Sequence, residues 1–249
     1  MSSSTSRVPN LPLRGDVEIP QLGFGVFKVP PEDTAEVVTR ALQTGYRHID
    51  TATAYRNEAG VGQAIRAAGL DRGEVFVTTK CFNDDHGTTR PSEPARRAST
   101  VSSSTTWTSI SSPGPCRRTT STSRPGRRSS SCGPGAGAVD GVSNFQPAHL
   151  ERVIAETGVT PAVNQVELHP LLQQPGLRRE HEELGIVTEA WSPLARGEVL
   201  EDPAIAEIAE AHGKTPGQVV IRWHIQLGNV VIPKSVSPER MPHSFARVP

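Results

Sequence analysis

Short apolar runs alternate with segments of helical periodicity along most of this chain. Residues 22–27 read Leu-Gly-Phe-Gly-Val-Phe, and the next segment places apolar residues at helical spacing until Gly45. The same unit recurs, with predicted strands at 46–50, 74–80, 142–145, 162–168, 186–191 and 230–232, and predicted helices at 57–69, 147–157, 176–184, 203–212 and 215–227. Strands alternating with helices indicate a parallel sheet, and about seven strands favour a closed (β/α)8 TIM barrel over an open sheet.

The length of 249 residues suits one such α/β barrel, and we expect a single domain spanning residues 1–249. Residues 8–20 carry Arg-Gly-Asp between short apolar pairs, which predicts an N-terminal β-hairpin across the barrel bottom. The N-terminus lacks an apolar signal core, and no segment approaches the roughly 18 apolar residues of a membrane helix. We therefore expect a cytoplasmic protein without a membrane partner. Three cysteines without metal-binding spacing are expected to be free thiols, and no metal site is predicted.

Residues 88–138 depart from this pattern. The 51 residues include 13 Ser, 9 Thr, 6 Pro, 5 Gly and eight Arg, with no Lys and one acid. The formal net charge of zero therefore hides a basic segment of charge +7 and a remainder of charge −7. Only Val101, Trp107 and Ile110 are large and apolar, so the segment buries too little surface to offset the entropy lost on ordering. We expect it to be disordered and to replace the fourth strand and the flanking helices.

Three residues of complementary chemistry follow two neighbouring predicted strands. Asp50 ends the run 46–50, Tyr55 follows five residues later, and Lys80 closes the run 74–80. Because the carboxyl ends of parallel strands meet at one end of a barrel, an acid, a phenol and an amine should converge there. An ammonium held by a carboxylate stabilises a phenolate and lowers the pKa of the phenol, which predicts a proton-donating tyrosine. A surface phenol beside an unrelated ion pair is the alternative that the residue types alone leave open.

Seven ordered stretches carry a resemblance to a known family. They are Gly-Phe-Gly-Val-Phe (23–27), Gly-Tyr-Arg-His-Ile-Asp-Thr-Ala-x-x-Tyr-x-Asn-Glu (45–58), Thr-Thr-Lys (78–80), Gly-Val-Ser-Asn-Phe (141–145), Asn-Gln-Val-Glu-Leu-His-Pro (164–170), Trp-Ser-Pro-Leu (191–194) and Ile-Pro-Lys-Ser-Val (232–236). With them the chain resembles the aldo-keto reductases, and within these the bacterial 2,5-diketo-D-gluconate reductase-like group.

This resemblance implies an oxidoreductase that reduces an aldehyde or ketone, such as a dicarbonyl or a keto sugar, with hydride from NADPH. Tyr55 would protonate the carbonyl oxygen, and Asp50 and Lys80 would tune it. The carboxamide of the nicotinamide would be held by Ser143, Asn144 and Gln165, and its ring by Trp191. The implied cofactor site is completed by Gly23, Ser192 and Leu194, and by Lys234, Ser235 and Arg240 toward the 2′-phosphate, since fixed cations prefer phosphate.

Each of these residues also has an ordinary structural explanation. Ser143 and Asn144 are good caps for the helix predicted from residue 147. Trp191 fits core packing, since one aromatic residue after a strand is weak evidence for a site. Lys234 and Arg240 fit solvated surface charges, the usual place of such residues.

The catalytic histidine of the resembled family has no counterpart here. Residues 105–115 read Thr-Thr-Trp-Thr-Ser-Ile-Ser-Ser-Pro-Gly-Pro, and the only nearby histidine is His86. Codons for residues 104–112 can be chosen that encode Asp-Tyr-Val-Asp-Leu-Tyr-Leu-Ile one base out of phase, so we infer a frame shift over about 88–140, which alone does not restore the histidine. We also expect a truncated C-terminus. Loss of a strand predicts an open barrel with exposed edges and an unstable product.

Three functions remain in competition at this point. The first is an NADPH-dependent carbonyl reductase that we expect to act as a monomer on a small-molecule substrate. The second is a catalytically impaired relative that at most binds dinucleotide. The third takes the basic segment as a nucleic-acid-binding insert, and we expect no nucleic-acid partner because the segment has no Arg-Ser repeat and a single Trp for base stacking.

Overall fold

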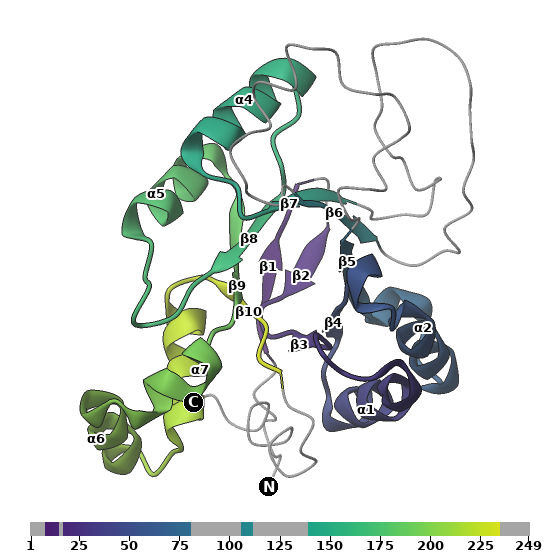
Figure 1. Cartoon of the computed structure of the whole chain (residues 1–249), viewed down its shortest axis with the longest axis vertical. Coiled ribbons are helices and arrows are strands. Elements are labelled where there is room, and N and C mark those ends of the chain that lie inside the picture. Colours follow the sequence, from purple (N-terminus) through teal and green to yellow (C-terminus); the bar gives the residue numbers. More distant parts are fainter. Residues whose placement is uncertain (1–7, 15–16, 81–105, 112–138, 235–249) are drawn as a thin grey trace, which may run out of the picture.

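Eight strands form one sheet that closes on itself. The computed structural model describes residues 8–14, 17–80, 106–111 and 139–234. In spatial order the strands run β10-β9-β8-β7-β6-β5-β4-β3. Their bounds are β3 Phe24–Gly25, β4 His48–Asp50, β5 Phe76–Lys80, β6 Thr106–Ser111, β7 Val139–Ser143, β8 Val163–Glu167, β9 Val187–Trp191 and β10 Val230–Val231. A parallel bridge between Leu22 and Val231 joins the two ends of the sheet, which makes the ring of strands seen in Figure 1.

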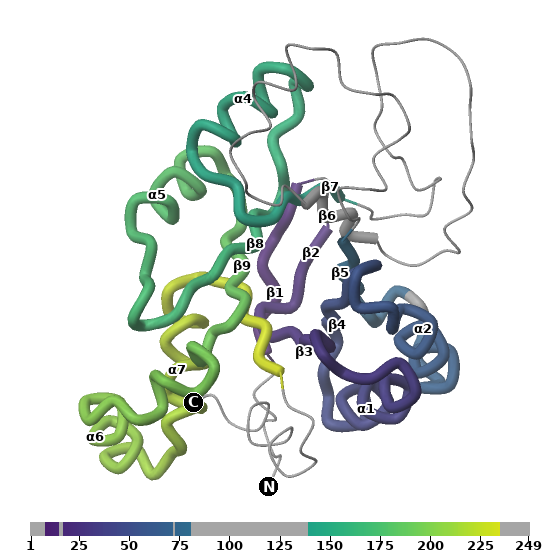
Figure 2. The backbone as a smooth tube through the Cα atoms, viewed as in Figure 1, coloured from purple at the N-terminus to yellow at the C-terminus, as the bar shows by residue number. Residues whose placement is uncertain are grey.

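Helices lie outside the ring, as the alternating sequence pattern predicts (Figure 2). They are α1 Pro31–Thr44, α2 Glu58–Ala67, α4 Pro147–Thr157, α5 Pro175–Leu184, α6 Pro203–Ala211 and α7 Pro216–Gln226, with short 3-10 turns η1 Thr53–Tyr55, η2 Arg72–Glu74 and η4 Ala195–Glu201. All of these α-helices except α2 begin with proline, whose fixed φ suits the first helical position and whose missing N–H costs nothing there. The predicted α/β barrel is confirmed, and no helix in the described ranges is long and apolar enough to cross a membrane.

The N-terminal hairpin plugs one end of the ring. Strands β1 (Asn10–Pro12) and β2 (Glu18–Pro20) pair antiparallel, with Leu11 opposite Ile19. Ile19 is fully buried and belongs to the apolar cluster that contains Phe76, Val163 and Val230 from the strands of the barrel. Figure 1 shows the hairpin across the middle of the ring. The expected lid at the barrel bottom is therefore present, and it leaves the opposite end of the barrel for chemistry.

Strand β6 differs from the sequence expectation. A parallel strand would be expected between β5 and β7. In the described residues this place is taken by β6, which runs antiparallel to both neighbours. Val77 pairs with Ser111 on one side, and Trp107 pairs with Val142 on the other. The open barrel expected from the loss of a strand is therefore not observed, because backbone hydrogen bonding depends little on which side chains a strand carries. The remainder of the basic segment lies outside the described residues.

Candidate active site

The predicted trio meets at the carboxyl ends of β4 and β5. The Lys80 ammonium donates a hydrogen bond to Asp50 Oδ1, and it donates a second one to the carbonyl oxygen of Thr51 at 3.1 Å. Asp50 and Lys80 are only 5% and 6% exposed, so their ion pair is formed inside the barrel. The Lys80 Nζ lies 5.6 Å from the centroid of the Tyr55 ring. The alternative of an unrelated surface ion pair does not fit this buried arrangement.

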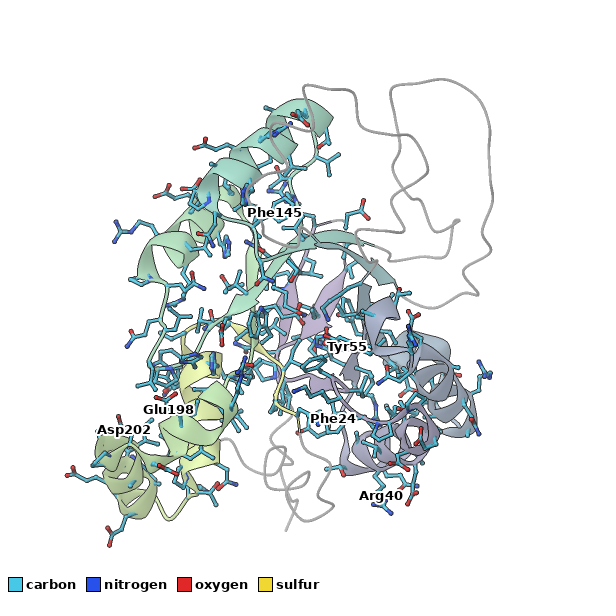
Figure 3. All side chains as sticks on the ribbon, viewed as in Figure 1. Phe24, Arg40, Tyr55, Phe145, Glu198 and Asp202 are labelled. Carbon is cyan, nitrogen blue, oxygen red and sulfur yellow. The ribbon has the colours of Figure 1, made fainter. Side chains whose placement is uncertain are left out.

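Tyr55 ends the short turn η1 and stands on the inner side of the ring in Figure 3. Its ring packs against the exposed Phe27, with 5.0 Å between the ring centroids. Burial raises the pKa of Tyr55, whereas the Lys80 ammonium lowers it and the Asp50 and Glu189 carboxyls raise it further. The sequence prediction had the direction of the Lys80 effect right, but the net pKa lies above the ordinary value because burial outweighs the ammonium. The Tyr55 phenol therefore keeps its proton at neutral pH.

For Lys80, in contrast to Tyr55, neighbouring charges outweigh the effect of burial on the pKa. Burial lowers the pKa of Lys80, but the attraction of Asp50 and the further negative potential of Tyr55 and Glu189 outweigh burial, so the pKa lies above its ordinary value. Lys80 is charged throughout the neutral range. A permanent positive charge thus stands beside the phenol ring of Tyr55.

Asn57 holds the loop that carries Tyr55. Its side chain is 1% exposed and donates to the carbonyl oxygens of Val26 at 2.9 Å and Val29 at 3.2 Å. The same amide accepts a hydrogen bond from the Thr51 hydroxyl at 2.8 Å. Three contacts to two segments fix the loop after β4 against the loop after β3. The position of the Tyr55 phenol is therefore determined by a buried amide two residues further along the chain.

Gln165 connects the trio to the far side of the barrel. Its Nε2 donates to Asp50 Oδ1 at 2.9 Å, and it lies on β8 in register with Glu189 on β9. Because Nε2 is engaged by Asp50, the amide oxygen of Gln165 is the atom left to accept from a carboxamide. The predicted role of Gln165 at the nicotinamide is compatible with this contact, and the structure adds a direct link to the carboxylate.

The residues after β7 and β9 form a second group at the same barrel end. The Trp191 indole N–H donates to Asn144 Oδ1 at 2.9 Å, and the Ser143 hydroxyl donates to the Gln165 carbonyl oxygen at 3.1 Å. Helix α4 is capped by Gln146 in a reciprocal box with its third residue, so Ser143 and Asn144 are not its caps. Trp191 is partly exposed, which does not fit core packing. The ordinary explanations for these three residues are thus removed.

Strained backbone is concentrated at this end of the barrel. Among the described residues, seven other than glycine have positive φ: Lys28, Arg56, Asn144, Gln174, Ser192, Ala195 and Arg196. Every one lies in a connection that follows β3, β4, β7, β8 or β9, with Ala195 and Arg196 at the start of η4, and none lies in the connections at the hairpin end. Such conformations cost about 1–3 kcal/mol each and gather where a site constrains the chain. The strained backbone therefore lies at the same end of the barrel as Asp50, Tyr55 and Lys80.

Two lysines come together where the barrel closes. Lys28 follows β3 and Lys234 follows β10, and these are the strands joined by the closing bridge. Burial and the nearby Lys28 cation lower the pKa of Lys234. Two like charges close to one another favour a bound anion, and a phosphate group suits such a pair. Lys234 is exposed, as a solvated surface charge would be, but Lys28 gives it a partner that sequence reasoning did not include.

The other residues predicted for the cofactor site have no contact with the trio among those described above. The Gly23 N–H donates to the Val231 carbonyl oxygen at 2.9 Å, and the α-carbon of Gly23 faces the buried His48 ring, which gives this glycine a packing reason. Ser192 has φ 50° in the loop after β9, and Leu194 is partly buried against a small apolar cluster. Ser235 and Arg240 lie outside the described residues. No group of three His, Cys, Asp or Glu in the described ranges could hold a metal ion.

Because β6 runs antiparallel to its neighbours, its N-terminal part lies next to the site. Thr108 pairs with Lys80 and Thr106 pairs with Ser143, so the N-terminal part of β6 lies at the end of the ring where parallel strands would end. The family resemblance places a histidine at the end of a parallel fourth strand. None of residues 106–111 is a histidine, so this strand contributes no imidazole to the site.

Sequence reasoning missed several residues of the site. Asn57 and His48 enter the sequence prediction only as members of a motif, and Lys28 and Glu189 do not enter it. A detectable signal exists for two of them, because His48 and Glu189 are titratable residues within runs that are predicted to be buried strands. A buried strand tolerates such a residue only when it has partners or a function.

Comparison with known proteins gives a consistent result. A model of the aldo/keto reductase family matches residues 21–106 and 138–248. An aldo-keto reductase of Mycolicibacterium smegmatis is 49% identical, with 95% of this chain and 86% of that protein covered. Methylglyoxal reductase DkgA of Salmonella typhimurium is 46% identical, with 92% and 83% covered.

Solved structures agree with these relatives. An aldo/keto reductase from Brucella melitensis superimposes with a TM-score of 0.73 at 38% identity, and 96% of this chain and 92% of that chain are covered. A mutant of Gox0644 in complex with NADPH superimposes with a TM-score of 0.71 at 34% identity, and the covered shares are 95% and 86%. The family match skips most of the basic segment, between residues 106 and 138.

Proposed function

The chain belongs to the aldo/keto reductase family, a group of NADPH-dependent oxidoreductases, and from this premise we propose that Tyr55 donates the proton in the reduction of a small aldehyde or dicarbonyl. The single observation that carries the proposal is the buried Asp50–Lys80 ion pair beside the Tyr55 ring. A charged lysine next to the phenol offsets the negative charge that develops on the tyrosine oxygen as the proton leaves. The carboxylate fixes the ammonium at this place.

Residues at the same barrel end fit a bound NADPH, whose nicotinamide supplies hydride when present. The partly exposed Trp191 indole, fixed by Asn144, offers a flat surface for a ring. Ser143 and the amide oxygen of Gln165 can meet a carboxamide, since Gln165 Nε2 is already engaged by Asp50. Lys28 and Lys234 would hold phosphate. These assignments follow from unsatisfied hydrogen-bonding capacity and charge.

The substrate class is proposed from the mouth of the site and from the relatives. Phe27 is 52% exposed and borders Tyr55, so an apolar surface lies next to the proton donor. Relatives from Salmonella and Escherichia coli bear the name methylglyoxal reductase. Methylglyoxal is a small dicarbonyl that fits beside a single aromatic ring, and we take it as the first substrate to test, with a keto sugar as the second.

The reversed strand favours one alternative function. Because β6 supplies no histidine beside Lys80, a carbonyl oxygen would be positioned by Tyr55 without an imidazole. An impaired relative that binds NADPH and reduces nothing would have the same Asp50–Lys80 pair. The impaired relative and the active reductase would both bind NADPH, so only a measurement of turnover distinguishes them.

The deciding experiment measures NADPH oxidation with methylglyoxal in the unmodified chain, in Tyr55→Phe and in Tyr46→Phe. A general acid contributes roughly 10²–10⁴-fold, so we expect Tyr55→Phe to lose at least about 100-fold in kcat. The chain has two tyrosines, and the buried Tyr46 serves as a matched control that should keep its turnover. Quenching of NADPH fluorescence without turnover in the unmodified chain would select the impaired relative, and full activity in Tyr55→Phe would overturn the role of Tyr55.

A further inference from the structure

Glu189 is an acidic residue in the closed interior of the barrel. It lies in the middle of β9, it is 0% exposed, and among the described residues neither of its carboxyl oxygens has a hydrogen-bond partner. Its neighbours in register are Gln165 on β8 and Val230 on β10. A buried carboxyl without hydrogen bonds is expensive to keep, so its presence calls for an explanation.

The groups facing Glu189 come from several strands. His48 on β4 places Nε2 3.6 Å from Glu189 Oε1, and burial lowers the pKa of His48 to about 4, so this ring is neutral and the contact is no ion pair. Gln165, the neighbour of Glu189 in register, donates a hydrogen bond to Asp50, and Asp50 accepts one from Lys80. The charged groups acting on Glu189 are therefore the acid Asp50 and the cation Lys80.

These surroundings keep the Glu189 carboxyl neutral at neutral pH. Burial and the Asp50 carboxylate raise the pKa of Glu189 to about 8, while Lys80 and the nearby Gln165 amide oppose the rise. The Gln165 amide acts on the carboxyl without the geometry of a full hydrogen bond. A neutral acid leaves Lys80 with one carboxylate as its counter-charge. An ionised Glu189 would give it two.

We propose that Glu189 is a positioning residue for the proton donor: neutral Glu189 leaves the Lys80 charge available to Tyr55, and ionised Glu189 cancels part of it. The inference builds on the proposed function of Tyr55. Negative charge on Glu189 raises the pKa of both Tyr55 and Lys80, and its effect on Tyr55 disfavours the tyrosinate that proton donation produces. Carbonyl reduction should therefore slow as pH rises through the ionisation of Glu189, near pH 8.

The test that needs no turnover is an ultraviolet titration of tyrosinate. The spectrum of Tyr55→Phe, subtracted from that of the unmodified chain, isolates Tyr55 because Tyr46 is the other tyrosine. The same subtraction is made in the Glu189→Gln background. At high pH Glu189 is ionised, so we expect Tyr55 to titrate on the order of one pH unit lower in Glu189→Gln than in the parent. Glu207→Gln, on the exposed side of α6, is the matched control and should leave the titration unchanged.

Two further measurements separate the outcomes. Infrared difference spectra of the unmodified chain should show a protonated carboxyl band at about pH 7 that disappears as pH rises through about 8, and this band needs no variant to fold. The pH profile of kcat/KM should lose its limb near pH 8 in Glu189→Gln. Equal Tyr55 titrations in both backgrounds, or no protonated carboxyl at about pH 7, would overturn the inference. Failure of the proposed function shows itself differently, as unchanged turnover in Tyr55→Phe.

Discussion

Gly23 illustrates how closely single residues pack beneath the site. A methyl group built on its α-carbon would lie 2.6 Å from His48 Nδ1, closer than real side chains approach. His48 in turn is fully buried between Thr78, at 2.9 Å from Nε2, and Glu189. The glycine therefore makes room for an imidazole that touches the polar interior of the barrel.

Gly23→Ala should lower the free energy of unfolding by about 1–3 kcal/mol, because overpacking forces the buried ring to move. Gly73→Ala is the matched control, since nothing lies within 4 Å of a methyl group there and the residue is exposed. We expect the control to change stability by less than about 0.5 kcal/mol. Urea unfolding of both variants measures the difference. Equal stability of Gly23→Ala and the parent would show that the His48 ring is not held as described.

At the scale of elements, β6 determines whether the barrel is closed. It pairs with β5 over four residues and with β7 over five, although its sequence is rich in Ser and Thr. Threonine and tryptophan have good strand propensity, and the backbone donors and acceptors of β5 and β7 must be satisfied by some neighbour. A strand of reversed direction can fulfil this need. It cannot bring the same side chains to the catalytic end.

Ser109→Pro should cost about 2–3 kcal/mol in the free energy of unfolding. Ser109 pairs with Thr79 and Asp140 in the middle of the strand, and proline removes a ladder hydrogen bond there. Ser109→Val keeps the backbone donor and should leave stability unchanged or slightly raised. Thermal unfolding followed by circular dichroism compares the two variants with the parent. A proline variant as stable as the valine variant would contradict the pairing of β6.

For the whole molecule, buried titratable groups set how stability depends on pH. Burial lowers the pKa values of His48, His181 and His224 to about 4, and burial with Asp50 raises that of Glu189 to about 8. Between about pH 4.5 and 6.5, unfolding makes three histidines take up protons and makes Glu189 release one. The histidines destabilise the fold as pH falls, and Glu189 stabilises it.

The net effect is a loss of stability in acid. We expect the free energy of unfolding to fall by roughly 2 kcal/mol per pH unit around pH 5.5, the difference between the two opposing contributions. Glu189→Gln removes the opposing contribution, so its free energy of unfolding should fall more steeply in acid, and its stability advantage over the parent should reach its full size above about pH 8. Urea titrations at several pH values measure both slopes. A variant with a slope as shallow as that of the parent would show that Glu189 is ionised in the folded chain at neutral pH.

Local pattern was sufficient to predict much of this protein. Periodicity predicted the helices and the strands other than β6, because burial of one face imposes a repeat that the sequence must carry, and the turn residues Arg-Gly-Asp predicted the hairpin. The convergence of Asp50, Tyr55 and Lys80 was predicted because parallel strands end on the same side of a barrel. Ordered motifs predicted the family. None of these inferences needed to know which distant segments touch.

Other features depended on contacts between distant segments. The direction of β6, the Gln165–Asp50 hydrogen bond and the isolation of Glu189 all follow from how strands align across the closed ring. Register and closure are not encoded in any one segment, since each strand contributes only one side of a contact. Sequence alone thus predicted that Asp50, Tyr55 and Lys80 lie together. The tertiary structure decided which further charges act on that lysine, because electrostatic coupling in a barrel is set by what its far wall brings inside.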